Sequence, residues 1–379
     1  LLMFRQWSRT SLEKNLEIIF LMNTADLKLL QKQLITWYRA NQRDLPWRRS
    51  NTPYHIWVSE VMLQQTQVKT VLNYYHRFLT KYPGIQRLAA ADLQAVLKAW
   101  EGMGYYARAR NLHRAAKTVM QDHGGRIPDQ WETFRSLPGV GDYIAAAVLS
   151  IAFNQPYPVV DGNVKRVLAR LHKIYAPVNR PGSDKQFKKA AARLLDPGRP
   201  GDFNQAMMEL GALVCKPRNP LCDACPITRM CRAYQTRQVD QFPKRQKLKA
   251  TPQYHIAVGV IYKNGRVLIT RRKEEGLLGG LWEFPGGKIK NGESAEAACI
   301  REIKEEVNLD VQIERHLAQV KHAYTHFKIV MDVFCCEYVS GRVYLRGPAA
   351  FRWIRLNEYR NYPFPKANHK FIPLLIKSA

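Results

Sequence analysis

Apolar residues recur at three- and four-residue spacing along residues 26–233, as Leu27, Leu30, Leu34 and Trp37 illustrate. This spacing places apolar side chains on one face of successive α-helices. The first part of the chain is therefore expected to be an all-α domain.

Beyond residue 252 the pattern changes to short runs that are typical of β-strands. Residues 255–262 and 267–270 form two such runs, and Asn264 and Gly265 between them are a strong signal for a β-hairpin. The second part is therefore expected to be an α/β domain. Its other predicted elements are a helix at 295–307 and strands at 311–320 and 329–338.

The length of the chain favours two domains over one. Residues 232–251 carry six Lys or Arg against one Asp, which indicates a linker that either lies on phosphates or is a solvated tether. Residues 1–21 have too short an apolar run for a secretory signal, and Met22 is a candidate start. The expected organisation is an extension of unknown role at 1–21, a helical domain at 22–235, a basic linker at 236–252 and an α/β domain at 253–379.

The chain of 379 residues carries 59 Lys and Arg against 31 Asp and Glu, a formal net charge of +28 at pH 7. So large a charge favours a polyanionic partner, and DNA or RNA fits best. The alternatives are a basic surface exposed to solvent and an anionic membrane. No apolar run approaches the ~18 residues needed to cross a bilayer, so membrane insertion is not expected.

Four of the seven cysteines lie within 17 residues, with the spacing C-x6-C-x2-C-x5-C. The spacing of all seven is too irregular for a disulfide framework, which favours a reducing, cytoplasmic compartment. Four thiolates bind zinc or a [4Fe–4S] cluster. Structural zinc usually takes two CxxC pairs and only one is present, so the cluster is favoured. The four predicted ligands are Cys215, Cys222, Cys225 and Cys231. This loop resembles the cluster loop of the endonuclease III superfamily of DNA glycosylases.

The string LPGVG at 137–141 predicts a tight turn between two helices. Such a turn can point several backbone N–H groups at one phosphate. Leu137, Gly139 and Gly141 resemble a helix–hairpin–helix DNA clamp, although a plain glycine cap between helices is the simpler alternative.

Two carboxylates are the candidate catalytic groups. Asp161 follows an apolar segment at the start of a helix, where an Asp can be no more than an N-cap. Glu60 lies between Trp57 and Leu63 on a largely apolar helix. If Glu60 is buried, its pKa should rise and a proton should be available near neutrality. The alternative is a surface Glu on a partly exposed helix.

The string WVSEVMLQQTQ at 57–67 resembles the adenine DNA glycosylase family, as do LPWR at 45–48, GMGYYAR at 102–108 and FNQAMM at 203–208. The resemblance implies an enzyme that flips adenine out of the duplex and removes it, with Glu60 as acid and Asp161 as the second carboxylate. By the same resemblance Asn163 orients Asp161, Arg48 and Gln205 line the adenine pocket, and Gln65 and Tyr105 enter the base stack. Tyr105 as a core residue and Gln65 as a surface residue are the simpler alternatives.

Tyr143 separates this chain from related lyases. The lyase members of the superfamily place a Lys two residues after the last glycine of the hairpin, and this chain has Tyr143 there. A phenol cannot form a Schiff base. A monofunctional glycosylase without strong strand cleavage is therefore expected. Its expected partner is double-stranded DNA with an A:8-oxoguanine or A:G mispair, and it is expected to act as a monomer in the cytoplasm, associated with the nucleoid in a bacterium.

The second domain resembles a Nudix fold, which in this family recognises 8-oxoguanine opposite the adenine. The recognition loop of the family is commonly Phe-Ser-His. In this chain Tyr324, Thr325 and His326 keep an aromatic ring, a hydroxyl and an imidazole in the same order.

Residues 287–309 contain a nearly complete Nudix box, G-x5-E-x7-REIKEEVNL. Glu302, Glu305 and Glu306 would share one helix face, and carboxylates suit Mg²⁺ on a diphosphate. The simpler alternative is a solvated Glu/Lys face. Asn308 replaces the usual Gly and is the next-best residue for a left-handed helix end. Two alternative functions follow: a bifunctional enzyme that also hydrolyses oxidised nucleoside triphosphates such as 8-oxo-dGTP, and a non-catalytic iron–sulfur DNA-binding protein.

Overall fold

The computed structural model describes residues 22–50, 52–247 and 250–377. The N-terminal extension expected at 1–21 lies outside these residues. The described residues divide into two compact units, one within residues 22–64 and 126–247 and the other within residues 65–125 and 250–377. No helix among the described residues is both long enough and apolar enough to span a membrane.

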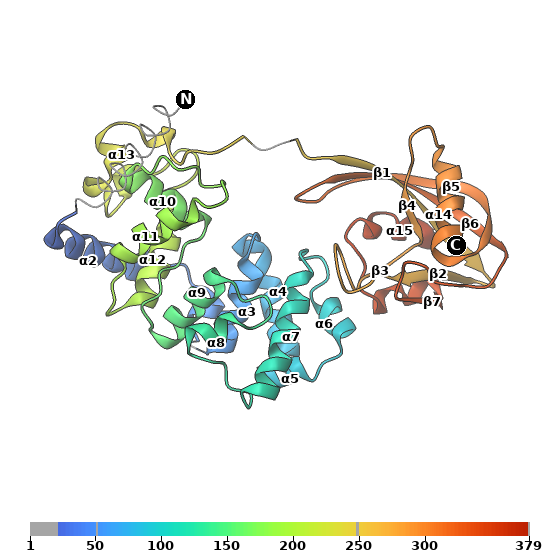
Figure 1. The fold of residues 1–379 in the computed structure, drawn as a ribbon, viewed down its shortest axis with the longest axis horizontal. Coiled ribbons are helices and arrows are strands. Elements are labelled where there is room, and N and C mark those ends of the chain that lie inside the picture. The colour runs from blue at the N-terminus through green and yellow to red at the C-terminus, as the bar shows by residue number, and fades with distance from the viewer. Residues whose placement is uncertain (1–21, 51, 248–249, 378–379) are drawn as a thin grey trace, which may run out of the picture. The chain divides into compact units, whose positions relative to one another are not determined.

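The elements of the first unit are all helices among its described residues (Figure 1). Its main core joins α2, α10, α11 and α12 through residues such as Leu30, Leu168, Phe187 and Leu210. Its helices are α2 (Thr24–Asn41), η1 (Pro46–Arg48), α3 (Pro53–Leu63), α8 (Trp131–Arg135), α9 (Asp142–Phe153), α10 (Gly162–His172), α11 (Asp184–Leu194), α12 (Pro200–Leu213), η2 (Cys222–Ala224), η3 (Thr228–Met230), α13 (Arg232–Gln235) and η4 (Val239–Gln241).

The second unit combines helices from two parts of the chain with a seven-stranded sheet. The helices of the first part are α4 (Val68–Lys81), α5 (Ile85–Ala89), α6 (Leu93–Ala99) and α7 (Ala107–Asp122). The strands are β1 (Gln253–Lys263), β2 (Arg266–Arg271), β3 (Trp282–Glu283), β4 (Gly286–Lys288), β5 (Asp310–Ala323), β6 (Lys328–Ser340) and β7 (Ala350–Ile354). The helices that accompany the sheet are α14 (Ala295–Val307), η5 (Leu356–Asn361), η6 (Asn368–Lys370) and α15 (Ile372–Lys377).

The sheet has the order β3-β2-β1-β6-β5, with β4 paired to β1 and β7 to β2. The β1–β6 pairing is parallel, and the other pairings are antiparallel. Successive side chains of a strand point to opposite faces. Ala257 packs with Ile303 of α14 on one face, whereas Val258 belongs to the core with Phe371 near α15. The C-terminal sheet is therefore covered by helices on both faces.

The predicted fold class, an all-α part followed by an α/β part, is confirmed. The helix expected at 295–307 has these same bounds. The predicted hairpin forms between β1 and β2, where Asn264 and Gly265 have φ of 50° and 70°. Strands β3, β4 and β7, which are two to five residues long, were not predicted.

The segment expected as a linker begins as folded structure. Phe242 is 1% exposed, and Arg170 of α10 donates hydrogen bonds to the carbonyl oxygens of Val239 and Phe242 at 3.2 and 3.0 Å. The backbone N–H of Val178 donates to the carbonyl oxygen of Lys244 at 3.0 Å. This part of the segment is therefore held against the first unit and is not a solvated tether.

Candidate active site

Glu60 lies on α3, a helix that is apolar on all sides. Pro53 occupies the first turn, where its fixed φ and missing N–H cost nothing. Every residue from Ile56 to Met62 is buried, as expected for a helix that is hydrophobic all round. Glu60 is only 4% exposed, so it is not a surface residue.

Tyr143 of α9 is the hydrogen-bond partner of Glu60. Its Oη donates to Oε2 of Glu60 at 2.5 Å. Burial raises the pKa of Glu60 to about 7, the hydrogen bond from Tyr143 opposes this shift, and the charge of Asp161 adds to it. Burial and the two carboxylates raise the pKa of Tyr143 well above its usual value, so the phenol stays a donor. Near pH 7 a large share of Glu60 is therefore a neutral acid.

Asp161 is the N-cap of α10. Its Oδ1 accepts a hydrogen bond from the backbone N–H of Val164 at 2.7 Å, and its Oδ2 accepts one from Nδ2 of Asn163 at 3.1 Å. Burial raises the pKa of Asp161, and these hydrogen bonds oppose the shift because they favour the ionised form. Its charge also raises the pKa of Glu60. Asp161 is thus a helix cap and a neighbour of the buried acid at once.

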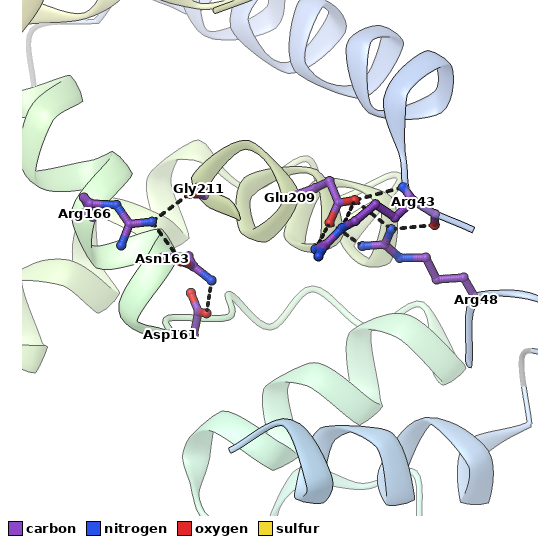
Figure 2. Close-up of polar contacts among 7 residues, drawn as sticks. All are labelled: Arg43, Arg48, Asp161, Asn163, Arg166, Glu209 and Gly211. Carbon is purple, nitrogen blue, oxygen red and sulfur yellow. Dashed lines mark hydrogen bonds and ion pairs between the residues drawn. The ribbon is translucent and has the colours of Figure 1, made fainter. Parts of the chain in front are cut away.

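A chain of hydrogen bonds runs from Asp161 towards the cysteine loop (Figure 2). Nη2 of Arg166 donates to Oδ1 of Asn163 at 2.8 Å and to the carbonyl oxygen of Gly211 at 2.7 Å. Nε of Arg166 donates to the carbonyl oxygen of Cys215 at 2.7 Å. A Cβ on Gly211 would lie 2.6 Å from Cβ of Asn163. Helices α10 and α12 therefore approach each other closely at the residue that holds Asp161.

Glu209 of α12 binds the guanidiniums of both Arg48 and Arg43 (Figure 2). Glu209 is 1% exposed. Burial alone would raise its pKa, but hydrogen bonds from Arg43 and Arg48 lower the pKa of Glu209 to about 2. Arg43 and Glu209 were not predicted as site residues from the sequence. The available signal was a single Glu inside the apolar string MMELGAL at 207–213.

Asn204 was also missed as a site residue. It is 3% exposed; its Oδ1 accepts from the backbone N–H of Val159 at 3.0 Å, and its Nδ2 donates to the carbonyl oxygen of Tyr157 at 2.8 Å. These bonds hold the segment that leads to Asp161. The neighbouring Gln205 donates to the carbonyl oxygen of Gly201 at 3.4 Å, along its own helix.

Burial raises the pKa of three thiols of the cysteine loop, those of Cys222, Cys225 and Cys231. Burial raises the pKa of Cys225 to about 12, and Cys215, Cys231 and Cys222 add to this shift. Thr228, between Cys225 and Cys231, has a buried Oγ1 with no hydrogen-bond partner. Among residues 22–50, 52–247 and 250–377, no group of three or more His, Cys, Asp or Glu side chains is arranged to hold a single metal ion.

The predicted hairpin forms between α8 and α9. Leu137 is buried, and the backbone N–H of Val140 donates to its carbonyl oxygen at 3.0 Å. Gly139 has φ of 77°, a conformation that favours glycine, and Gly141 is the N-cap of α9. The first N–H groups of α9 have no partner within that helix, so the turn presents donors next to Tyr143.

Gln65 and Tyr105, which belong to the second unit, have left-handed backbones with φ of 56° and 49°. Such a conformation in a non-glycine residue costs about 1–3 kcal/mol and is common at functional sites. The guanidinium of Arg108 lies 5.2 Å from the centroid of the Tyr105 ring. Tyr105 is therefore held by packing and is not a core residue in a relaxed conformation.

The turn between β5 and β6 contains the three residues expected to recognise 8-oxoguanine. Tyr324 stacks on Phe327 with ring centroids 4.8 Å apart, and burial raises the pKa of Tyr324 to about 12. Oγ1 of Thr325 is hydrogen-bonded to Oη of Tyr105. The structure therefore joins Thr325 of this turn to Tyr105, but it gives no such link for His326.

The Nudix box lies on α14 and the loop before it. Arg301 donates to Glu293 at 2.7 Å, to Glu302 at 2.7 Å and to Glu305 at 3.2 Å. Burial raises the pKa of Glu306 to about 7, and other carboxylates add to the shift. Asn308 has φ of 59° and caps the end of α14, as expected for the residue that replaces glycine. Two of the three expected metal ligands are therefore paired with Arg301.

Comparison with known proteins identifies the class first. Residues 58–195 match the HhH-GPD superfamily of base excision DNA repair proteins, and residues 257–374 match the NUDIX domain. The solved structure of a thermostable thymine-DNA glycosylase is 30% identical with a TM-score of 0.50, covering 55% of this chain and 97% of that one. The chain is therefore a DNA glycosylase of base excision repair with a C-terminal Nudix domain.

Adenine DNA glycosylases match nearly the whole chain. The enzyme of Rattus norvegicus is 36% identical over 391 residues, which cover 89% of this chain and 76% of the relative. The enzyme of Buchnera aphidicola subsp. Schizaphis graminum is 31% identical over 344 residues, which cover 90% and 97%. This chain belongs to the adenine DNA glycosylase family, and its substrate is DNA. The alternative of a non-catalytic DNA-binding protein does not fit a family of enzymes.

Proposed function

We propose that this enzyme removes adenine paired with 8-oxoguanine or guanine in double-stranded DNA, with Glu60 as the acid. The observation that supports it is the buried Glu60, whose pKa is about 7 and which is bonded to Tyr143. The neutral carboxyl gives its proton to N7 of adenine while the C1′–N9 bond breaks and its electron pair leaves with the base. Such acid catalysis is worth about 10²–10⁴ in rate.

Asp161 is proposed to stabilise the positive charge that develops on the sugar. A second carboxylate does this in glycoside hydrolysis, either electrostatically or by transient bonding. Water then bonds to C1′ through its oxygen, and the proton it loses restores Glu60. Asn163 is proposed to orient Asp161, since it donates to Oδ2 at 3.1 Å. Arg48 and Gln205 are proposed to line the adenine pocket.

Base release from defined duplexes tests the substrate. The expected result is release of adenine opposite 8-oxoguanine and guanine, with little release from an A:T pair. A T:G duplex is the matched control, because a thymine-DNA glycosylase is structurally similar. Release of thymine from T:G, or equal release of adenine from A:T, would contradict the proposal.

Tyr143 supports a monofunctional reaction, because its phenol is protonated and bonded to Glu60 and has no amine to attack the sugar. Borohydride added during excision should trap no enzyme on the DNA, and strand cleavage should need alkali. A trapped covalent complex would overturn this assignment.

Residues of the second unit are proposed to read the opposite strand. Gln65 and Tyr105 would enter the base stack, and Tyr324, Thr325 and His326 would contact 8-oxoguanine. The bond between Tyr105 and Thr325 supports a joint action. Thr325→Ala should lower the ratio of the excision rates opposite 8-oxoguanine and opposite guanine. An unchanged ratio would argue against this role.

Leu137, Gly139 and Gly141 of the first unit are proposed to bind a phosphate through the hairpin.

Cys215, Cys222, Cys225 and Cys231 are proposed to hold a [4Fe–4S] cluster. The other three thiols raise the pKa of Cys225, and Oγ1 of Thr228 is buried without a hydrogen-bond partner. Both observations fit a group that binds the thiolates together. When bound, the cluster supplies cross-links that fix this loop, and the excision step uses none of its chemistry. The purified protein should contain about four irons and four acid-labile sulfides, as such a cluster requires. Zinc in their place would refute the proposal.

A second candidate function is hydrolysis of oxidised nucleoside triphosphates with Mg²⁺ held by Glu302, Glu305 and Glu306. The observation that favours it is the intact end of α14, where Asn308 adopts the left-handed conformation of the usual glycine. The parent protein should then convert 8-oxo-dGTP to monophosphate and pyrophosphate. Glu305→Gln should abolish this turnover and leave adenine excision unchanged. No turnover by the parent would end this candidate.

The domain limits 22–235, 236–252 and 253–379 and a monomeric state are also proposals. Both candidate carboxylates come from one chain, so one chain is sufficient for excision. Sedimentation of the active protein on DNA should give a single copy per mispair, and a dimer as the active species would contradict it.

A further inference from the structure

Glu209 of α12 binds the guanidiniums of both Arg43 and Arg48. Its carboxylate accepts hydrogen bonds from Nε, Nη2 and the backbone N–H of Arg43 at 2.9, 2.7 and 2.9 Å. It also accepts from Nη1 and Nη2 of Arg48 at 3.1 and 2.9 Å. With 1% of its surface exposed, Glu209 is a buried carboxylate that stays ionised only because these donors surround it.

Arg48 is fixed by this arrangement. Its side chain is 12% exposed, its Nη1 donates to the carbonyl oxygen of Arg43 at 3.0 Å, and its guanidinium lies 5.4 Å from the centroid of the Tyr38 ring. A guanidinium held by a bidentate carboxylate on one edge and an aromatic ring on its face has little freedom to rotate. Glu209 therefore sets the position of Arg48.

Glu209 also sets the local charge. The two guanidiniums carry two positive charges and Glu209 cancels one of them. The groups that act on Glu60 come from the elements around α3: Tyr143 from α9, Asp161 from the start of α10, and Arg48 from η1. Of these, the positive charge of Arg48 favours the ionised form of Glu60.

We propose that Glu209 is a positioning residue for adenine excision, which fixes the guanidinium of Arg48 and offsets one of the two positive charges of Arg43 and Arg48. This inference rests on the proposed role of Glu60 as the acid. Because the pKa of Glu209 is about 2, a purely structural ion pair would support the fold equally between pH 5.5 and pH 8. The proposed role instead acts through the protonation of Glu60.

The test is the pH dependence of single-turnover adenine release by the full-length protein. In Glu209→Gln the positive charges are no longer balanced, so the midpoint of the basic limb should fall by about one pH unit. The rate at pH 8 should therefore drop about tenfold more than the rate at pH 5.5. Asp202→Asn is the matched control, because Asp202 lies on the same helix and pairs with Arg39 at the surface. Its midpoint should not move.

Arg43→Gln provides the opposite change. It removes one positive charge and leaves the Glu209–Arg48 pair, so the midpoint should rise. Arg43→Gln also tests the proposal if thermal unfolding shows that Glu209→Gln does not fold. The side chain of Arg43 is 35% exposed, so its replacement should disturb the core less. Equal losses at every pH in Glu209→Gln, or an unmoved midpoint in Arg43→Gln, would overturn the proposal. Normal excision by Glu60→Gln would instead show that the acid itself was wrongly assigned.

Discussion

At the scale of single residues, the site depends on a carboxyl group placed where ionisation is costly. Glu60 is 4% exposed on an apolar helix, and burial is the largest cause of its raised pKa. Tyr143 and Arg48 favour the ionised form, whereas Asp161 disfavours it. The pKa of about 7 is the balance of these opposing effects, so single substitutions around Glu60 should move it in directions that can be stated beforehand.

Tyr143→Phe should move the pH profile of excision upward. The hydrogen bond from Tyr143 lowers the pKa of Glu60, so its loss should raise that pKa by about one unit. Glu60 would then stay protonated to higher pH, and excision should persist further into the alkaline range. Single-turnover rates between pH 6 and pH 9 measure the shift. A midpoint that stays in place or falls would show that the hydrogen bond does not control Glu60.

The sequence identifies the residues of this site whose motifs are local and misses those whose partners are distant. Glu60, Asp161 and the cysteines stand in recognisable strings. Arg43 and Glu209 are 166 residues apart, and Asn204 and Val159 are 45 apart. Their pairing depends on how α12 packs, and nothing in the spacing of either residue indicates it.

At the scale of elements, the crossing of α10 and α12 places Asp161. Asn163 lies where Gly211 allows the two helices to approach closely. Arg166 donates hydrogen bonds to Asn163 and to the carbonyl oxygens of Gly211 and Cys215. A substitution that changes how α10 and α12 cross should therefore move the carboxylate of Asp161, although Asp161 itself is unchanged.

Gly211→Ala should impair both stability and excision. The new Cβ would lie 2.6 Å from Cβ of Asn163 and 3.1 Å from its backbone, and overpacking of this kind costs about 1–3 kcal/mol. Thermal unfolding and single-turnover excision measure the two effects. Gly162→Ala is the control, since nothing lies within 4 Å of its added Cβ. Equal behaviour of the two variants would mean that the close approach is unimportant.

Element types were predictable where the periodicity is strong, as in α14 and the β1–β2 hairpin. The parallel pairing of β1 with β6 was not, because parallel neighbours are joined by long connections whose partners no local signal specifies. The basic segment at 236–247 was expected to be part of a linker because it is rich in Lys and Arg. This composition gave no indication that Phe242 is buried.

At the scale of the whole molecule, the net charge of +28 suits a polyanionic substrate. Cations released from DNA when Lys and Arg bind phosphates make affinity depend on salt. The charge therefore predicts salt-dependent binding to DNA of any base sequence.

Binding to an undamaged duplex should weaken steeply with salt. For about six phosphate contacts, the affinity should fall on the order of 10³-fold between 50 and 200 mM salt. Titration of a labelled duplex by fluorescence anisotropy measures this. A fall of less than about tenfold would mean that no more than one or two phosphates are bound.

The pH dependence of single-turnover adenine release from an A:8-oxoguanine duplex tests the central claim most directly. The proposed role requires a protonated Glu60, and the pKa of Glu60 is about 7. The rate should therefore be constant in mild acid and fall about tenfold per pH unit well above the midpoint. Glu60→Gln, with no proton to give, should lose about 10²–10⁴ of the rate at every pH. A flat profile from pH 5.5 to pH 8.5, or a Glu60→Gln enzyme that remains active, would contradict the role of Glu60 as the acid.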